Sequence, residues 1–343
     1  METTTRSAPQ GRLLLDRARA GDEDAYRRLV EPHRRELHAH CYRMLGSSHD
    51  ADDALQNALL RAWRALPRFE ARRPLRAWLY AIATNASLRL IERRPKRMLP
   101  IDGAPLLESA WLEPYPDEPS GLGARRESIE LAFIAALQHL PANQRAVLIL
   151  REVLGFSARE VADALDTTVA SVNSALQRAR RSVDERVPEQ SQQANLRAIG
   201  DRRLRRVVAE YMDAIELGDV DRLVALLAED ATWSMLAGGG DRAHGPRTWY
   251  RGRRAIAAFL TAGPLSGNWQ WRHVATTANG QPAVAGYVWH PGLSVHRLRV
   301  LDVLTLANER IAAVTAFLDP TVLHRFGLSD ELGWATRASA GHP

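Results

Sequence analysis

The chain has 343 residues, 45% of them hydrophobic and 25% charged, which is the composition of a globular protein with two or three domains. No run of 18 apolar residues occurs, which excludes a membrane-spanning helix. The three leucines near the N-terminus are too few for a signal peptide, so we expect a cytoplasmic protein without a membrane partner. The single Cys41 excludes an internal disulfide and a cysteine-based zinc site, and no metal or cofactor is expected.

The net charge of +6 comes from arginine, since Lys96 is the only lysine, and it suits a polyanionic partner without specifying one. Residues 99–124 hold five prolines, five acidic residues and no Lys or Arg, which predicts an extended acidic linker. A second helical piece follows this linker and ends at a short polar stretch. The predicted division is therefore 10–98, 99–124, 125–187, 188–200 and 201–330.

The first piece is predicted to be helical throughout. From 51 to 66, apolar residues recur with the spacing of an amphipathic helix, and the same pattern predicts a second helix over 75–91. On the second of these helices, Trp78, Asn85 and Arg89 lie along one flank of the apolar stripe. Tyr80 and Thr84 lie opposite the stripe and are therefore expected at the surface.

The second piece is also helical. Ser157 and Glu160 have the spacing of a capping box, which predicts the start of a short helix. A turn at 166–168 is followed by a predicted helix over 169–183 that has an apolar stripe and an arginine-rich face. This is the helix-turn-helix arrangement, in which the second helix enters the DNA major groove. The plain alternative is a packed helical hairpin that does not bind DNA.

In the third piece the hydrophobic pattern changes from helices to strands. Helices are predicted over 204–216 and 220–227, and strands over 231–236, 285–290, 297–306 and 311–318. This order of elements predicts an α+β fold with a curved antiparallel sheet.

The first two pieces resemble sigma-70-type RNA polymerase sigma factors of the extracytoplasmic-function (ECF) group. The resemblance rests on DADDALQNALLRAWRALPRF at 50–69, RPLRAWLYAIATNASLRLIERRP at 73–95, and the helix-turn-helix at 140–185. It implies two all-α domains, a region 2 helical bundle and a region 4 helix-turn-helix, joined by the extended linker. The implied activity is that of an alternative sigma factor, not of an enzyme, with no catalytic residues of its own.

The resemblance also implies partners and contact residues. The partners are core RNA polymerase, through its clamp helices and flap, and promoter DNA, as a duplex −35 element and a melted −10 element. An anti-sigma protein or a small ligand is a further candidate partner. The polymerase contacts implied are Asp53, Gln56, Arg61 and Trp63. The −10 contacts implied are Arg72, Arg73, Trp78, Tyr80, Thr84, Asn85 and Arg89. The −35 contacts implied are Ser171, Asn173, Ser174, Gln177, Arg178 and Arg181.

The third piece is similar to the SnoaL-like fold, on the segments 223–235, 249–260 and 310–320. This likeness implies a cone-shaped α+β domain that regulates the sigma portion. Its candidate cavity residues are Trp233, His290, Asp302 and Asp319. Asp302 shares a strand face with apolar residues, so its carboxyl group is either paired or has a raised pKa.

Three alternatives stay open. Trp78 is either a core aromatic or a nucleic-acid contact. The chain as a whole could instead be a SnoaL-like isomerase, hydrolase or cyclase fused to a DNA-binding module, because that fold also hosts enzymes. A plain helix-turn-helix repressor would leave the region 2 pattern unexplained.

Overall fold

A computed structural model of the protein describes residues 7–70, 74–93, 112–117, 129–187, 190–236 and 248–333. The chain divides into two compact units. Unit 1 comprises residues 1–98 and 137–183, and unit 2 comprises 99–136 and 184–343. The predicted linker thus falls in the same unit as the C-terminal domain. For the part of the chain that the structure describes, no helix is both long and apolar enough to cross a membrane.

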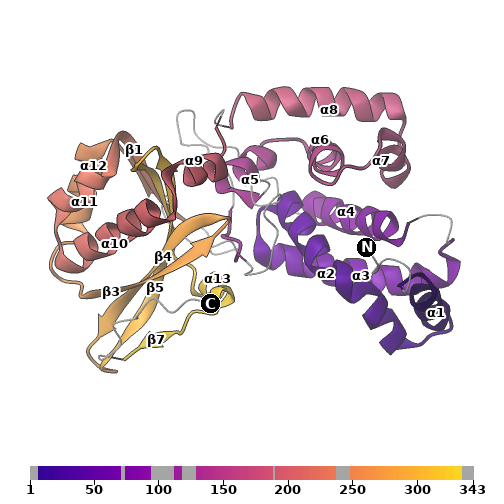
Figure 1. The fold of residues 1–343 in the computed structure, drawn as a ribbon, viewed down its shortest axis with the longest axis horizontal. Helices are drawn as coiled ribbons and strands as arrows, with labels where there is room; N and C mark the ends of the chain where they lie inside the picture. The colour runs from indigo at the N-terminus through magenta and orange to yellow at the C-terminus, as the bar shows by residue number, and fades with distance from the viewer. Residues whose placement is uncertain are drawn as a thin grey trace. The chain divides into compact units, whose positions relative to one another are not determined.

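Unit 1 is helical (Figure 1). Its first part consists of α1 (Ser7–Arg19), α2 (Glu23–Leu45), α3 (Ser48–Ala65), a 3-10 turn (Leu66–Arg68) and α4 (Leu75–Arg93). Its second part consists of the end of α5 (Leu131–Gln138), then α6 (Ala142–Leu148), a π-helical turn (Ile149–Val153), α7 (Ala158–Ala164) and α8 (Val169–Asp184). The helices predicted at 51–66, 75–91 and 169–183 are confirmed, with ends moved by up to three residues.

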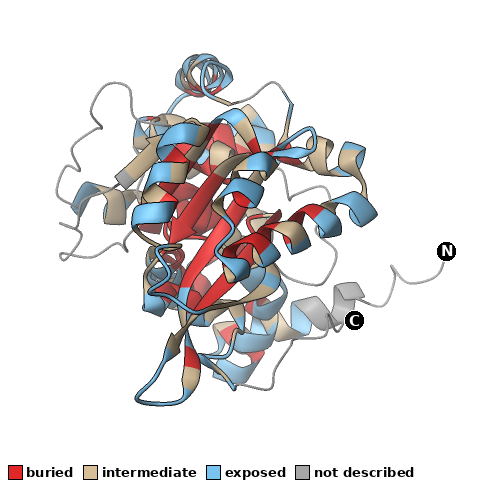
Figure 2. Ribbon diagram, turned by 90° about the vertical axis from the view of Figure 1, so that its left-hand side faces the viewer, coloured by how far each residue is buried: buried red, intermediate tan, exposed pale blue. Residues whose placement is uncertain are grey.

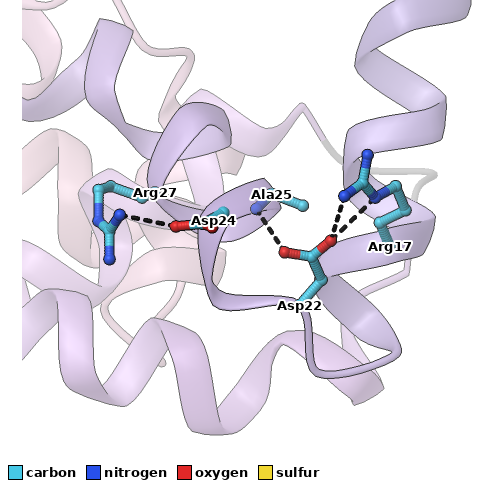
Figure 3. A network of polar contacts seen from close by, with 5 residues as sticks. All are labelled: Arg17, Asp22, Asp24, Ala25 and Arg27. Atoms are coloured by element: carbon cyan, nitrogen blue, oxygen red, sulfur yellow. Dashed lines mark hydrogen bonds and ion pairs between the residues drawn. The ribbon is translucent and has the colours of Figure 1, made fainter.

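Capping residues set where the helices of unit 1 begin. The Asp22 side chain accepts a hydrogen bond of 2.9 Å from the backbone N–H of Ala25 at the start of α2 (Figure 3). The same carboxylate pairs with Arg17 at 2.6 Å, so α1 and α2 are joined at their turn. The Ala25 N–H first and the Arg17 guanidinium second lower the pKa of Asp22. Such a cap stabilises the start of a helix, because it satisfies a backbone N–H group that has no partner within the helix.

Arg145 joins the two parts of unit 1 from within the core. Its side chain is buried on α6 and donates to the carbonyl oxygens of Met44 and Leu140, and to the side chain of Gln138. These acceptors satisfy the two terminal nitrogens of the guanidinium, which offsets much of the cost of burying the charge.

Unit 2 is an α+β domain. Its helices are α9 (Gln192–Ile199), α10 (Asp201–Leu217), α11 (Val220–Leu226), α12 (Arg253–Ala262) and α13 (Pro320–Leu323), the last followed by a 3-10 turn (His324–Phe326). Its strands are β1 (Leu227–Leu236), β2 (Thr248–Arg251), β3 (Trp271–Ala278), β4 (Gln281–His290), β5 (Val295–Ala307), β6 (Arg310–Phe317) and β7 (Glu331–Leu332). The sheet order is β2-β1-β6-β5-β4-β3, and β7 pairs with β5.

The α+β class is confirmed, but the prediction of an antiparallel sheet is wrong at one place. Strand β1 pairs with β6 in parallel, while the other strand pairs are antiparallel. Between the two strands the chain passes through β2, α12, β3, β4 and β5, and it returns so that β6 runs beside β1 in the same direction. Burial is continuous along the central strands beneath helices α10 and α11 (Figure 2). Strands β2 and β3 and helix α12 were not predicted.

Candidate functional site

The outer face of α8 is the candidate for binding duplex DNA. The capping box of Ser157 and Glu160 is present at the start of α7, and Asp166 takes a left-handed conformation in the following turn. Thr168 then accepts a hydrogen bond of 3.1 Å from the N–H of Ser171, which fixes the start of α8. All six predicted −35 residues are exposed: Ser171, Asn173, Ser174, Gln177, Arg178 and Arg181.

The opposite face of α8 packs into unit 1 through Val172, Leu176, Ala179 and Val183. Arg180 differs from the neighbouring arginines because its guanidinium pairs with Glu152 at 2.6 Å. Helix α8 therefore has one packing face and one long polar face. A hairpin that served only packing would not need an arginine-rich outer face of this length.

Two predicted −10 residues are not where the sequence pattern placed them. Tyr80 is 1% exposed and Thr84 is fully buried, so the expectation that they lie at the surface is wrong. The Tyr80 hydroxyl donates to Glu36 at 3.0 Å, and Thr84 lies 2.8 Å from Nε2 of the buried His40. Helix α4 is covered on more than one side, because α2, α3, α6 and α7 all pack on it. A helix covered in this way has no single apolar stripe from which its outer side could be inferred.

The remaining −10 candidates divide between core and surface. Trp78 is half-buried against Phe69, with ring centroids 4.7 Å apart, which agrees with the core alternative. Asn85 and Arg89 are exposed. The predicted contacts Arg72 and Arg73 lie outside the described residues.

Elements of the second helical part lie on α4 within unit 1. The ring of Phe156 meets the ring of Tyr80 edge-on, with centroids 5.5 Å apart, and the Arg76 guanidinium lies over both rings. Asn85 donates to the carbonyl oxygen of Ala164 in α7 at 3.2 Å. The start of the helix-turn-helix thus covers the side of α4 that carries Tyr80 and Asn85.

The outward face of α3 carries the predicted polymerase contacts. Asp53, Gln56 and Arg61 are exposed, whereas Trp63 is half-buried and packs on Tyr26 with ring centroids 4.9 Å apart. Leu60 lies among them and is 49% exposed. The sequence pattern did not single it out, because one extra apolar residue in an amphipathic helix is not distinctive.

In unit 2, part of the predicted linker is hydrogen-bonded to the turn between β3 and β4. Asn279 in this turn is fully buried. Its Oδ1 accepts from the N–H of Tyr115 at 2.8 Å, and its Nδ2 donates to the carbonyl oxygen of Ile129 at 2.6 Å. The Asn279 N–H donates back to the Tyr115 carbonyl at 2.8 Å, and the Gly280 N–H donates to Asp117 at 2.7 Å. One asparagine therefore holds two separate points of the chain, Tyr115 in the predicted linker and Ile129 beyond its end.

Glu130 makes a second set of contacts beside the first. Its carboxylate is buried and accepts from the N–H groups of Gln192 and Gln193, at 3.0 and 2.8 Å, at the start of α9. The Leu131 N–H donates to Gln281 at 3.1 Å. We call these contacts of Tyr115, Asp117, Ile129, Glu130 and Leu131 with Asn279, Gly280, Gln281, Gln192 and Gln193 the linker clasp. Sequence reasoning missed it, although Asn279-Gly280 is a strong signal for a two-residue hairpin turn.

Unit 2 also contains a cavity of about 240 Å³ between its helices and its sheet. Its wall is mostly apolar and aromatic, and includes Trp233, Phe259 and Trp271. Asp302 lines it from β5, is 4% exposed, and accepts a hydrogen bond of 2.9 Å from the Tyr211 hydroxyl at Oδ2. Burial raises the pKa of Asp302 to about 7, and the Tyr211 hydrogen bond opposes this only in part. The sequence left this carboxyl either paired or with a raised pKa, and in the structure it accepts a hydrogen bond from Tyr211 while burial raises its pKa.

The other two cavity candidates lie elsewhere. His290 is exposed at the end of β4 and borders a separate hollow of about 470 Å³. Asp319 caps α13, where its side chain accepts from the N–H of Thr321 at 2.9 Å. Both predictions are therefore wrong, because each residue sits at the end of an element and not along the strand faces that enclose the cavity. No group of three or more potential metal ligands occurs among the residues that the structure describes.

Comparisons with known proteins match three family descriptions along the chain. Sigma-70 region 2 matches residues 29–97, sigma-70 region 4 matches 130–183, and a SnoaL-like domain matches 208–314. The crystal structure of the Mycobacterium tuberculosis ECF sigma factor SigJ superposes with a TM-score of 0.57 at 23% identity. It covers 86% of this chain and 97% of that chain, which shows a shared fold.

Relatives in sequence agree with these matches. The ECF RNA polymerase sigma-E factor of Escherichia coli is 29% identical over 179 residues, which is 51% of this chain and 93% of that protein. The ECF RNA polymerase sigma factor SigG of M. tuberculosis is 42% identical over 332 residues, which is 92% of this chain and 86% of that protein. Both sigma regions and the C-terminal domain are thus shared with one relative, and the chain belongs to the ECF RNA polymerase sigma factors.

Proposed function

We propose that this protein is an alternative sigma factor that binds core RNA polymerase, recognises −35 and −10 promoter elements, and promotes melting of the −10 element. The observation that carries this proposal is the long exposed polar face of α8, on a capped helix-turn-helix in the same unit as the α2–α4 bundle. The polymerase carries out the chemistry, and this chain supplies recognition.

Helix α8 reads the duplex −35 element in this proposal. Arg178 and Arg181 have the chemistry to contact phosphates or to bind guanine in a bidentate manner, and Asn173 and Gln177 can bind adenine. Arginine contacts to phosphate also make binding weaken with salt. The six exposed residues of α8 are the proposed contacts.

Helix α4 and the loop before it bind the melted −10 element. Taking a base out of the stack costs a few kcal/mol, which protein contacts must recover. Asn85 and Arg89 are exposed, whereas Tyr80 and Thr84 lie beneath neighbouring elements. We propose that α7 and Phe156 leave α4 when the polymerase binds, so that this side of α4 reaches the DNA.

The exposed face of α3 binds the polymerase, through Asp53, Gln56 and Arg61 together with Leu60. An apolar side chain amid polar residues is a common anchor at protein interfaces, since its burial adds affinity while the polar rim gives specificity.

The C-terminal domain regulates the sigma portion by holding the linker. The linker clasp places Tyr115, Ile129 and Glu130 on unit 2 through hydrogen bonds that a linker extended across the polymerase would have to give up. In this proposal the free protein is held in a restrained state. An anti-sigma protein or a small ligand remains a candidate for changing that restraint.

In vitro transcription with purified core polymerase on a promoter-library template tests the main proposal. New start sites that appear only with this protein, and that share upstream −35 and −10 sequences, are the expected result. The variant Arg178→Ala/Arg181→Ala should lose these starts, and Arg180→Ala, whose arginine pairs with Glu152, should retain them. Absence of new starts with the intact protein and with Asn279→Gly would contradict the proposal.

A SnoaL-like isomerase, hydrolase or cyclase with a DNA-binding module is the second candidate, and Asp302 in an aromatic cavity is the observation in its favour. Asp302→Asn separates the two: an enzyme would lose turnover, whereas a sigma factor would keep its promoter-specific starts.

A further inference from the structure

Exposed arginines gather on one face of unit 2, over the first two turns of α10 and the start of β6. They are Arg202, Arg203, Arg205, Arg206 and Arg310, which we call the arginine face. At 100° per residue, the four on α10 are centred on the side of the helix opposite Tyr211, which is fully buried in the core of unit 2. Arg310 belongs with them, because it lines the same surface hollow of about 240 Å³ as Arg203 and Arg206.

The placement of these charges is unfavourable for the helix itself. The N-terminus of a helix carries partial positive charge, so acidic side chains stabilise it and basic ones destabilise it. Helix α10 has the reverse distribution, with four arginines in its first six residues and Glu210, Asp213 and Glu216 in its second half. Arg202 also lies three and four residues before two other arginines, and like charges at these spacings repel. The fold of unit 2 gives no reason for this arrangement.

Ion pairs within the chain neutralise only part of this charge. Arg203 pairs with Glu309, and Arg206 pairs with Glu210 at 3.9 Å. Both pairs lie at the surface, where such contacts contribute little to stability. The other two arginines of α10 form no ion pair or hydrogen bond with the residues that the structure describes. Asp201 is the one acidic residue among 201–206, so the arginine face stays net positive.

The residues around the arginine face indicate which polyanion it suits. Single-stranded RNA and DNA are bound on aromatic side chains that stack with their bases, and protein interfaces are built around an apolar or aromatic centre. Residues 201–206 contain no aromatic side chain, and their one apolar residue, Leu204, is partly buried against the core. The phosphates of duplex DNA need neither feature, because arginine binds them through charge and hydrogen bonds.

We propose that the arginine face of unit 2 binds the phosphate backbone of duplex DNA without regard to base sequence. This goes beyond the proposed reading of the −35 element by α8, because it gives the C-terminal domain a DNA contact of its own. Side chains three or four residues apart on a helix are about 5–6 Å apart at Cβ, and duplex DNA carries one charge for about every 1.7 Å of its axis. Neighbouring arginines of α10 can therefore meet separate phosphates.

Fluorescence anisotropy of a labelled DNA duplex of arbitrary sequence, titrated with the intact protein at several salt concentrations, tests the proposal. Arg202→Gln/Arg205→Gln removes the two arginines of α10 without an ion pair. It should weaken binding on the order of tenfold and lower the slope of log affinity against log salt by about 1–2, since each phosphate contact contributes about 0.9. The matched control, Arg222→Gln/Arg254→Gln, removes two exposed arginines from α11 and α12 and should change affinity by less than about threefold.

A tethered cleavage experiment locates the contact without weakening it. Cys41 is buried and is the single cysteine of the chain, so Ala209→Cys, on the same side of α10 as the arginines, provides one accessible thiol for an iron–EDTA reagent. Hydroxyl radicals from this position should cut the duplex. A reagent on Ser266→Cys should not cut it, because this exposed residue precedes β3, at the end of the sheet away from Glu309.

Three results would overturn the proposal. These are equal losses of affinity for the two pairs of arginine substitutions, absence of cutting from Ala209→Cys, or tighter binding of single-stranded RNA that Arg202→Gln/Arg205→Gln abolishes, which would assign the arginine face to RNA. The difference between the pairs should persist in the Arg178→Ala/Arg181→Ala background, which removes the arginines of α8. Loss of like charges relieves α10, so Arg202→Gln/Arg205→Gln should not lower the unfolding midpoint. The assay contains no polymerase, so its outcome is independent of the proposed sigma activity.

Discussion

At the scale of single residues, Asp302 is a buried acid whose carboxyl group lines the cavity of unit 2. A carboxyl group with an ordinary pKa near 4 is held at about 7 by desolvation in the core of unit 2. The folded state therefore keeps a proton that the unfolded state releases between about pH 4 and 7. Folding stability falls as pH rises across this window, by up to roughly 1.4 kcal/mol for each pH unit.

We predict that Asp302→Asn removes this pH dependence. Asparagine keeps an oxygen that accepts from Tyr211 but carries no titrating proton. Relative to the unmodified protein, the variant should gain little stability at pH 4 and about 4 kcal/mol at pH 8 in unit 2. Chemical denaturation at several pH values measures the difference. Asp319→Asn, at the cap of α13, is the matched control, and a stability difference for Asp302→Asn that stays constant with pH would contradict the assignment.

The single-residue expectations succeeded where a position has only one plausible environment. Asp302 lies between apolar residues along a strand, and a strand alternates its faces, so burial followed from the pattern. Tyr80 and Thr84 failed, because α4 is packed by several helices that are distant in sequence. Helical periodicity reports the most apolar side of a helix and not how many neighbours cover it.

At the scale of elements, α8 carries three exposed arginines, of which one has an ion-pair partner in a neighbouring element. Arg180 pairs with Glu152, whereas Arg178 and Arg181 belong to the proposed DNA-binding face. We predict that Arg178→Ala/Arg181→Ala weakens promoter binding by the holoenzyme about 10- to 1000-fold and reduces its salt dependence. Arg180→Ala should change affinity less than threefold. Equal losses for both variants, in electrophoretic mobility assays at several salt concentrations, would mean that α8 acts through folding and not through contact.

The β3–β4 turn combines a fold requirement with a binding role. Asn279 and Gly280 both have positive φ, as a two-residue type I′ turn requires, and the Asn279 side chain then serves the linker. Asn308 in the β5–β6 turn has the same backbone conformation but is exposed. Replacing each of these asparagines with glycine separates the effect of the turn from the effect of the side-chain contact, because glycine suits both turns.

We predict that Asn279→Gly releases the linker, whereas Asn308→Gly does not. Loss of two side-chain hydrogen bonds, each of about 1 kcal/mol, should raise the population of the released linker by tenfold or more. A protease that cleaves after glutamate reports this at Glu130, which is buried and is followed by Leu131, and mass spectrometry identifies the cut. Similar cleavage rates for the two variants would show that Asn279 does not control the linker.

The sequence predicted the helix-turn-helix well and the linker clasp not at all. The capping box and the stripe of α8 are local signals within about 30 residues of chain. The clasp joins Tyr115 to Asn279 across 164 positions, and neither end carries a pattern that points to the other. The same holds for the parallel pairing of β1 with β6, which nothing local in either strand requires.

At the scale of the whole molecule, the linker clasp predicts that the C-terminal domain limits transcription. In run-off transcription with limiting core polymerase, Asn279→Gly in the full chain should initiate severalfold more often than the unmodified protein. Asn308→Gly should match the unmodified protein. If Asn279→Gly initiates less often, the clasp supports activity, and the sign of the proposed regulation is reversed.

The distance along the chain between the linker and its clasp also sets an order of events during synthesis. Both sigma regions and the linker leave the ribosome before the β3–β4 turn exists, and β1 waits for β6 to complete the sheet. At about 5–20 residues per second, the 95 positions between Asp184, where α8 ends, and Asn279 take roughly 5–20 s to translate. Every newly made molecule thus passes through an interval in which its DNA-binding portion is complete and its own restraint has not yet been made.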